Sequence, residues 1–552
     1  MKDASTGIGS DTVGKEPVIE LATRTSALAR RRSRLRETDL FWGGTAAVTA
    51  TVAAVLGWFL RAWPPHEDEA LALFVGRGSF GDLLHTVLGE RGGAPLHFGF
   101  AWAIAHLGGG LTALRIVSLV FATASVPLIA LLGRRLADGA VGLVAALLAS
   151  GTWVLLFHGI YGRMYSLFLF TSLLSFLALL SARDRGGARR FALWGLALLA
   201  VLASHPYALL VVIAQSFFVL LGRARVREGL MTLGAVAILG TPFWWADVVL
   251  RDRFDVGVGG GGSRLGSIGS VLDYLRLVAG DLSAGHDGWL VAVLLLAVAG
   301  AVLQARRGRG VLLLTACVIA VPAVSFVLVT LRSTISPESR HLIYVLPFLS
   351  VLLATALVEL ARLRPPQTVP VAAVAIMLLA VGEVSWAHRK TPQLFDGEPS
   401  GEPQARDAAA RWLVATGHAD DVLLGYEPIY LRAWERDRSF SALALPRADP
   451  VLLAQALNDI PEPLGHGVWV FDASDTTNVR ERQTIAFVLP KPASAFEGRA
   501  YGPYLVIRSR QPLRTRARYL AVSEDVMRLG RRLHIGDAGV NLQALRQAGS
   551  HL

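Results

Sequence analysis

Long apolar runs constrain the fold of this chain more than any other feature. Hydrophobic residues make up 53% of its 552 residues, more than soluble domains usually contain. A helix needs roughly 20 mainly apolar residues to cross a bilayer. Candidate spans cover residues 41–60, 112–132, 140–157, 164–181, 191–204, 207–222, 230–247, 289–304, 311–331, 341–361 and 369–387. The sequence predicts a polytopic α-helical membrane protein with about eleven transmembrane helices.

Arginine-rich stretches predict how the chain is oriented. They precede the first span or follow even-numbered spans, so eleven spans place all of them on one side: Arg30–Arg36, Arg134–Arg135, Arg183–Arg190, Arg223–Arg227, Arg306–Arg309 and Arg362–Arg364. Positive loops favour the cytoplasm. We therefore expect a bacterial plasma membrane protein with a cytoplasmic basic tail, residues 1–40, and an extracytoplasmic C-terminal region. The net charge of +12 then reflects orientation, and no nucleic-acid partner is expected.

The first outer loop, residues 61–111, carries an acidic group. His66, Glu67, Asp68 and Glu69 follow the first span directly. Carboxylates beside a bilayer are costly and mark candidate working sites. One acid could act as a general base while its neighbour orients a substrate or binds a metal. The structural alternative is an acidic cap at a helix N-terminus. The apolar spacing further along the loop predicts short interfacial helices that do not span the membrane.

Cationic and aromatic residues are predicted to lie on the same side. Arg163 opens the fourth span, in Arg163-Met164-Tyr165, and Arg340 opens the tenth. Arginine at an outer helix end either snorkels or binds a phosphate with its forked donors. His205 and Pro206 interrupt the apolar region 191–222, which predicts a hairpin there. These groups suit chemistry on a lipid-linked phosphate.

The C-terminal region has a different texture. Residues 390–552 alternate a helical pattern at Ala405–Ala415 with strand-like runs at Asp421–Gly425, Gly467–Phe471 and Tyr504–Ile507. We expect an extracytoplasmic α/β domain. Its Arg-rich end, after Arg508, could lie along anionic headgroups. A glycine run at 257–262 is interpreted as a linker, because it lacks the Lys-Ser/Thr ending of a phosphate-binding loop.

Five motifs, taken together and in order, resemble those of membrane glycosyltransferases of the C-fold (GT-C). The similar branch includes the protein O-mannosyltransferases and the lipid A aminoarabinose transferases. The resemblance covers roughly residues 40–390. The motifs are Asp68-Glu69, Gly93-Ala94-Pro95-Leu96-His97, Arg163-Met164-Tyr165, His205-Pro206-Tyr207, and Arg340 through Pro347. Many relatives carry Gln-Glu shortly before the third motif, where this chain has Ile160-Tyr161, which leaves the use of a divalent metal ion open.

The resemblance implies an inverting glycosyl transfer within residues 41–389. The donor would be a sugar on polyprenyl phosphate, and the acceptor a hydroxyl of a glycan, lipid or protein. Asp68 would be the base and Glu69 would orient the acceptor or the base. Arg163 and Arg340, with Tyr165 and His205 beside them, would bind the donor phosphate. No nucleotide cofactor is expected.

Three other functions fit parts of the pattern. A flippase or transporter of lipid-linked glycans should carry charges along a path through the bilayer midplane, whereas the predicted spans are nearly free of central charge. An oligosaccharide ligase or polymerase would use similar arginines, and the Asp-Glu pair would be incidental. A non-catalytic envelope scaffold would use its C-terminal domain to bind a partner.

Overall fold

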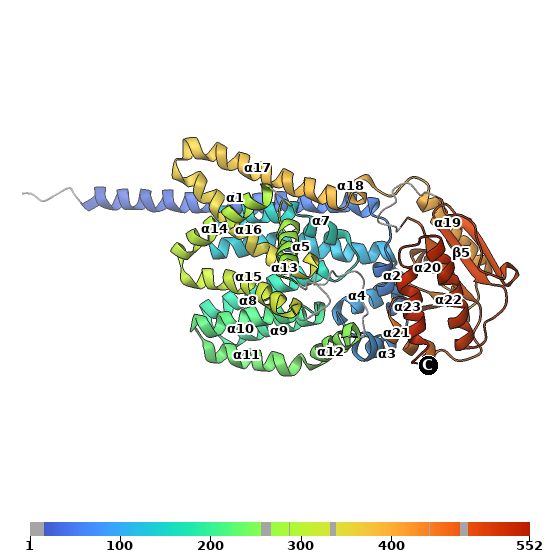
Figure 1. Cartoon of the computed structure of the whole chain (residues 1–552). Helices are drawn as coiled ribbons and strands as arrows, with labels where there is room; N and C mark the ends of the chain where they lie inside the picture. Colours follow the sequence, from blue (N-terminus) through green and yellow to red (C-terminus); the bar gives the residue numbers. More distant parts are fainter. Residues whose placement is uncertain are drawn as a thin grey trace, which may run out of the picture.

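The structure, a computed structural model, describes residues 16–255, 267–285, 288–331, 338–440, 442–474 and 484–551. It consists of a long helical bundle with a smaller sheet-containing domain at one end (Figure 1). The glycine run at 257–262 lies outside the described residues. The bundle contains α1 (Glu16–Ala62), α5 (Leu111–Leu136), α6 (Gly139–Gly151), α7 (Trp153–Ile160), α8 (Tyr165–Arg185), α9 (Ala188–Ser204), α10 (Ala208–Gly222), α11 (Val226–Leu239), α12 (Thr241–Asp255), α13 (Ile268–Asp281), α14 (Gly288–Arg307), α15 (Arg309–Thr330), the 3₁₀ helix η2 (Ser339–Val345), α16 (Leu346–Leu363) and α17 (Pro365–Lys390).

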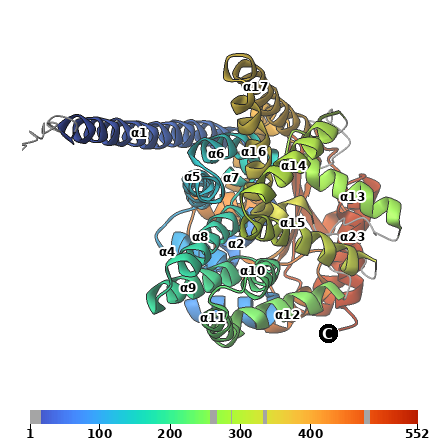
Figure 2. The ribbon, with the colours of Figure 1, turned by 90° about the vertical axis from the view of Figure 1, so that its left-hand side faces the viewer.

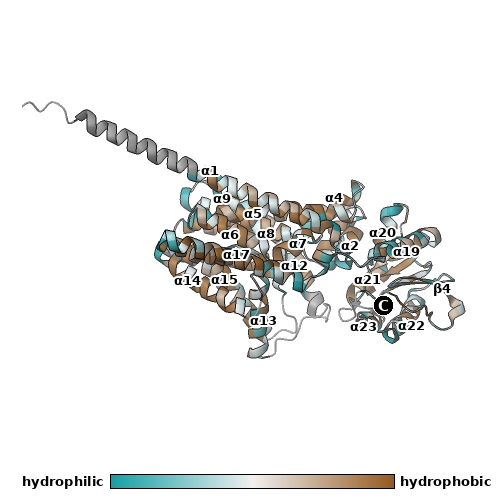
Figure 3. Cartoon of the chain, turned by 90° about the horizontal axis from the view of Figure 1, so that it is seen from above, coloured by the Kyte–Doolittle hydropathy of each residue, from teal (hydrophilic) through white to brown (hydrophobic). Residues whose placement is uncertain are grey.

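The bundle is that of a multi-pass membrane protein. Within the described residues, seven helices are long and apolar enough to cross a membrane, or up to nine if each of two bent pairs is one span. Apolar residues dominate along its length (Figure 3). Eleven spans are not confirmed, because α9 and α10 have only 17 and 15 residues.

Two expected straight spans are broken. The first bends by 65° between α6 and α7, at Thr152, and the second by 60° between α11 and α12, at Gly240. Thr152 is extended, with φ −69° and ψ 145°, and its hydroxyl bonds to the Ala149 carbonyl at 2.8 Å. Pro242 lies in the first turn of α12, where a proline is tolerated, whereas its missing N–H could not continue the hydrogen bonding of α11.

Burial separates central from peripheral spans. In their most apolar stretches, α16 is 89% buried and α8 72%, whereas α1 and α17 are each 22% buried. Seen along the bundle, α1 and α17 lie on the outside (Figure 2). Their exposed large side chains, such as Trp42 and Met377, are suited to lipid contact.

The arginine-bearing helix ends gather together. Arg307 and Arg362 both contact Asp138 and Glu359, and Arg135 bonds to Asp184 at 2.8 Å. These residues belong to α14, α16, α5, α8 and the turn between α5 and α6. The grouping agrees with a common side for these loops, as the sequence predicted.

Residues 61–111 form short helices that pack on the C-terminal domain. They are α2 (Glu67–Gly76), α3 (Phe80–His85), the π-helix η1 (Thr86–Arg91) and α4 (Pro95–His106). Leu73 and Phe74 of α2 share one buried cluster with Tyr430 and Trp434 of the C-terminal domain. The sequence predicted short helices here but not this common core. We call this contact region the junction.

The C-terminal domain is an α/β unit. Its sheet has the order β2-β1-β3-β5-β4, with β1, β2 and β3 parallel and β5 antiparallel to its neighbours. The elements, with α18 leading into them, are α18 (Gln393–Asp396), α19 (Glu402–Thr416), β1 (Val422–Leu424), α20 (Pro428–Arg436), β2 (Leu443–Leu445), α21 (Pro450–Asp459), β3 (Gly467–Asp472), η3 (Ala493–Ala495), β4 (Phe496–Tyr501), β5 (Tyr504–Ser509), α22 (Arg516–Arg532) and α23 (Ala538–Ala548).

The sequence predicted part of this secondary structure but no strand order. The three expected strands correspond to β1, β3 and β5, while β2 and β4 were missed. The Arg-rich end expected along headgroups forms α22 and α23. Their apolar residues, including Tyr519 and Leu542, are buried with Trp469 and Phe471 of the sheet.

Candidate active site at the junction

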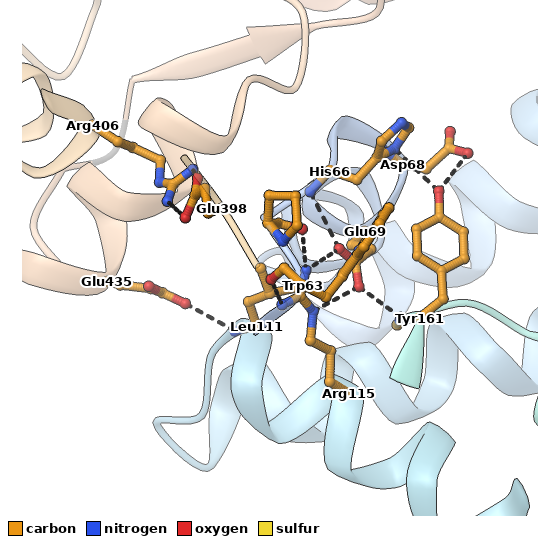
Figure 4. A network of polar contacts seen from close by, with 12 residues as sticks. Trp63, His66, Asp68, Glu69, Leu111, Arg115, Tyr161, Glu398, Arg406 and Glu435 are labelled. Atoms are coloured by element: carbon orange, nitrogen blue, oxygen red, sulfur yellow. Dashed lines mark hydrogen bonds and ion pairs between the residues drawn. The ribbon is translucent and has the colours of Figure 1, made fainter. Parts of the chain in front are cut away.

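The acidic group begins helix α2. His66 is its N-cap: the His66 Nδ1 accepts a hydrogen bond from the Asp68 N–H at 3.2 Å, and the Glu69 carboxylate accepts one from the His66 N–H at 3.2 Å. The helix dipole stabilises negatively charged side chains in the first turn, where Glu67, Asp68 and Glu69 lie. The acidic-cap alternative therefore describes the local structure correctly. Successive residues diverge by about 100° around a helix. Asp68 and Glu69 consequently have different partners (Figure 4), and Glu67 pairs with Arg447.

Glu69 is fully buried and fully paired. Its Oε1 and Oε2 accept hydrogen bonds from Arg115 Nε at 2.9 Å and Nη2 at 2.6 Å. The Gly162 N–H donates to Oε1 at 2.7 Å. Arg115 also donates to the Trp63 and Pro64 carbonyls at 2.8 and 2.7 Å. Glu69 therefore joins α2 to α5 and to the loop before α8, and Arg115 is a site residue that the sequence did not reveal.

Asp68 points away from this cluster and contacts Tyr161 instead. The Tyr161 hydroxyl donates to Asp68 Oδ2 at 3.1 Å and lies 3.1 Å from His66 Nδ1. Burial opposes ionisation of Asp68, but the charges of Arg163 and Arg340 and the Tyr161 hydrogen bond outweigh it. Together they hold the pKa of this carboxyl below its ordinary value. Asp68 is thus a stable carboxylate that faces cationic groups.

Two arginines near this carboxylate have hydrogen-bond donors without partners in the described structure. Arg163 Nη1 donates to the Asp68 main-chain carbonyl at 2.9 Å, and Arg340 Nη2 donates to Glu338 at 2.6 Å. The Nε atoms of both arginines are buried and have no hydrogen-bond partner among the described residues. A buried donor left unpaired costs about 1–3 kcal/mol. The arrangement is suited to an anion with several acceptor oxygens.

Aromatic and histidine rings adjoin Arg340. Arg340 lies over the Tyr165 ring at 5.4 Å, and Tyr165 lies 5.6 Å from His205. His205 Nδ1 accepts from the Tyr207 N–H at 3.0 Å, while its Nε2 is buried without a partner in the described chain. The expected residues Asp68, Arg163, Tyr165, His205 and Arg340 therefore converge in one region.

His97 of the interfacial motif belongs to the same region. Its side chain is buried in α4, and its Nε2 has no partner within the described ranges. Burial and the nearby charge of Arg163 lower its pKa to about 3. A neutral imidazole with an unused nitrogen can donate or accept one hydrogen bond, so His97 adds a neutral polar group to the site.

A second ion-pair cluster supports the segment that carries Arg340. Buried Asp281 accepts from Ser339 Oγ at 2.5 Å and from Trp386 Nε1 at 3.0 Å, and it also pairs with Lys390. The Lys390 ammonium lies 3.7 Å from the Trp153 ring centre. Ser339 precedes Arg340, so this cluster fixes the start of η2. No sequence pattern reveals this cluster, because its members are distant along the chain.

The sequence left the use of a divalent metal ion open. Among the residues that the structure describes, no group of three or more His, Cys, Asp or Glu side chains could bind a metal ion. At the position where similar transferases carry Gln-Glu, Tyr161 occupies the space beside Asp68. Within the described ranges, the side chains around Asp68 therefore do not form a metal site of this kind.

Comparison with solved structures identifies the fold. The crystal structure of ArnT from Cupriavidus metallidurans bound to undecaprenyl phosphate matches with a TM-score of 0.55 at 13% identity, covering 84% of this chain and 98% of that one. Its apo state gives 0.52 at 13% identity, with the same coverage. The oligosaccharyltransferase of Archaeoglobus fulgidus gives 0.47 at 14% identity, covering 76% of this chain and 67% of that one.

The two ArnT structures show the fold of this chain. The chain has the GT-C fold of membrane glycosyltransferases, which confirms the resemblance found in the sequence. No protein-family model matches the chain, and no curated protein matches it by sequence. The identity to ArnT is low, so the comparison concerns architecture, and the activity must be argued from the site.

Proposed function

We propose that this protein is a membrane glycosyltransferase that moves a sugar from a polyprenyl phosphate to an acceptor hydroxyl. The observation that carries the proposal is the arrangement around Asp68. An ionised carboxylate stands beside two arginines whose buried Nε donors lack partners in the described structure. A base and an anion site next to each other are what glycosyl transfer from a lipid phosphate requires. The undecaprenyl phosphate in the ArnT crystal structure supports this donor class.

The proposed reaction inverts the anomeric centre. The acceptor oxygen attacks the anomeric carbon while the bond from that carbon to the phosphate oxygen breaks. Asp68 accepts the proton of the acceptor hydroxyl, a step typically worth about 10²–10⁴-fold in rate. The polyprenyl phosphate leaves with the bonding electron pair, and Arg163 and Arg340 stabilise its charge. Tyr161 orients the Asp68 carboxylate, and Glu69 positions the helix turn that presents it.

Tyr165 and His205 complete the donor side of the site. Tyr165 lies beneath the Arg340 guanidinium, and the unpaired His205 Nε2 offers a further contact to phosphate or sugar. We place this site on the extracytoplasmic face of the plasma membrane, where the arginine distribution puts it. The acceptor hydroxyl belongs to a glycan, lipid or protein on that face.

One observation favours the flippase alternative. Glu383 in α17 is 1% exposed and its Oε2 has no partner in the described structure. A buried carboxylate within a span often marks an ion or substrate pathway. A flippase would move a lipid-linked sugar between leaflets without consuming it. Flipping can be distinguished from transfer experimentally, because the lipid-linked sugar would remain chemically intact.

A reconstituted assay tests the proposal. The full chain, purified into proteoliposomes, is supplied with radiolabelled polyprenyl-phosphate sugars and a bacterial envelope extract as acceptor. We expect labelled product and free polyprenyl phosphate from the native protein. Asp68→Asn should lower turnover by at least about 10²-fold, and Arg163→Gln should weaken donor use more than acceptor use. Asp396→Asn, an exposed control on α18, should have no effect. Normal turnover by folded Asp68→Asn would refute the base assignment.

A further inference from the structure

The C-terminal domain contains a pocket at the point where its strand order reverses. The chain runs from β1 to β2 on one side and returns to β3 on the other side of β1. In α/β sheets with parallel strands, ligands bind at the carboxyl ends of the strands at such a switch point. The pocket is partly open to solvent and includes Leu424 and Asp472, the last residues of β1 and β3.

A polar side chain in this pocket lacks a partner. Asn541 of α23 lines the pocket and is 3% exposed, and its Oδ1 has no hydrogen-bond partner in the described ranges. Buried amide oxygens are nearly always paired. Asp472, beside it, uses Oδ1 to accept from the Ser474 N–H at 2.8 Å and hydroxyl at 2.6 Å. The pocket therefore offers acceptor oxygens that a ligand with hydroxyl donors would satisfy.

The charges in the pocket restrict the chemistry of the ligand. Arg447 follows β2 and contacts three carboxylates: Glu67 at 2.5 Å, Asp537 at 3.5 Å, and Glu427. Asp472 lines the pocket as well, so carboxylates outnumber the guanidinium in and beside it. An anionic ligand would be repelled by this excess of negative charge, whereas a neutral polyol would not be.

The pocket is physically connected to the proposed active site. Arg447 lines the pocket and also donates through Nε at 2.9 Å and Nη2 at 2.5 Å to Glu67, the residue before Asp68. A ligand in the pocket would therefore lie against a side chain that holds the first turn of α2. This connection suits a pocket that holds the molecule on which the site acts.

We propose that this switch-point pocket binds a neutral sugar residue of the acceptor, which makes the acceptor a carbohydrate. That the bound sugar belongs to the acceptor rests on the proposed function. Sugar binding by the pocket does not itself require transfer. Binding and transfer can consequently be measured independently.

Binding is tested with the full-length protein in nanodiscs on an array of neutral, carboxylated and phosphorylated oligosaccharides, without donor. We expect binding to at least one neutral glycan. Asn541→Leu and Gly536→Gln should weaken it at least tenfold. A Cβ atom at pocket-lining Gly536 would meet no neighbouring atom within 4 Å, and the same holds at Gly539, which does not line the pocket. Gly539→Gln is therefore the matched control and should bind normally.

Several results would overturn the inference: no neutral glycan bound, binding confined to charged glycans, or binding that both pocket variants retain. The Gly536→Gln variant keeps the test valid if Asn541→Leu fails to fold. Sugar binding without any transfer by the native protein would refute the transferase proposal and leave the carbohydrate site standing. Transfer to a glycan that neither pocket variant impairs would refute the pocket alone.

Discussion

Glu69 and Arg115 form a buried ion pair joined by two hydrogen bonds, Nε to Oε1 at 2.9 Å and Nη2 to Oε2 at 2.6 Å. Their side chains are 0% and 6% exposed. The pair connects α2, which presents Asp68, to α5 of the bundle. The fixed position of Asp68 therefore depends on its neighbour, and Glu69 serves the site by positioning.

The first prediction concerns the stability that this pair confers. Removing one partner leaves the other charge buried and unpaired, which costs about 3–5 kcal/mol. We expect Arg115→Leu to lower the unfolding midpoint strongly in detergent-solubilised protein. The control is Arg135→Ala, which breaks the Arg135–Asp184 pair, whose side chains are 30% and 55% exposed, and should cost no more than about 1 kcal/mol. Similar shifts for both variants would contradict the structural role.

The second prediction concerns the pH dependence of transfer. The pKa of Asp68 lies below its ordinary value, so the carboxylate is lost only as pH falls through that lowered pKa. The profile of kcat/KM should therefore show no loss attributable to Asp68 between about pH 5 and 8. Arg163→Gln removes the largest favourable charge and should move the acid limb upward. A native acid limb near neutrality that Arg163→Gln leaves in place would argue against Asp68 as the base.

Some of this site could be predicted from sequence and some could not. Asp68, Arg163 and Arg340 stand out because charged residues at span ends are costly, and helix sidedness places them together. Tyr161 and Arg115 carry no such signal: an aromatic residue and a second arginine among apolar helices have many uses, and their partners are 93 and 46 residues away. The bends at Thr152 and Gly240 were missed because hydropathy indicates how long an apolar segment is but not whether its helix axis bends.

The third prediction tests the role of the Tyr161 hydroxyl. It is the side-chain donor to Asp68 in the described structure, and a hydrogen bond to a charged group is worth about 1.5–3 kcal/mol. Tyr161→Phe should lower kcat by about tenfold to a hundredfold, with little change in donor KM. Tyr344→Phe is the control, because the Tyr344 hydroxyl is buried without a partner in the described chain. Unchanged kcat in folded Tyr161→Phe would remove the orienting role.

The fourth prediction concerns stability against pH in the C-terminal domain. Burial, together with the charges of Glu398 and Asp472, raises the pKa of Glu402 to about 7, while Arg406 opposes the shift. The folded protein then binds more protons than the unfolded chain between the ordinary pKa of 4.5 and about 7. The contribution of protonated Glu402 to stability is therefore present below this pH window and falls as pH rises through it.

Glu402→Gln keeps the shape of the side chain and removes this titration. We expect the variant to be more stable than the native protein at pH 8 and nearly equal to it at pH 4.5, measured as unfolding midpoints of the full chain by scanning fluorimetry. Asp525→Asn, at an exposed position of α22, controls for a general change in net charge. Because Glu402→Gln and the native protein differ only at this titrating group, the difference between their unfolding midpoints should increase with rising pH. A gap that is constant across the range, or that closes as pH rises, would show that Glu402 is not held protonated by its buried surroundings.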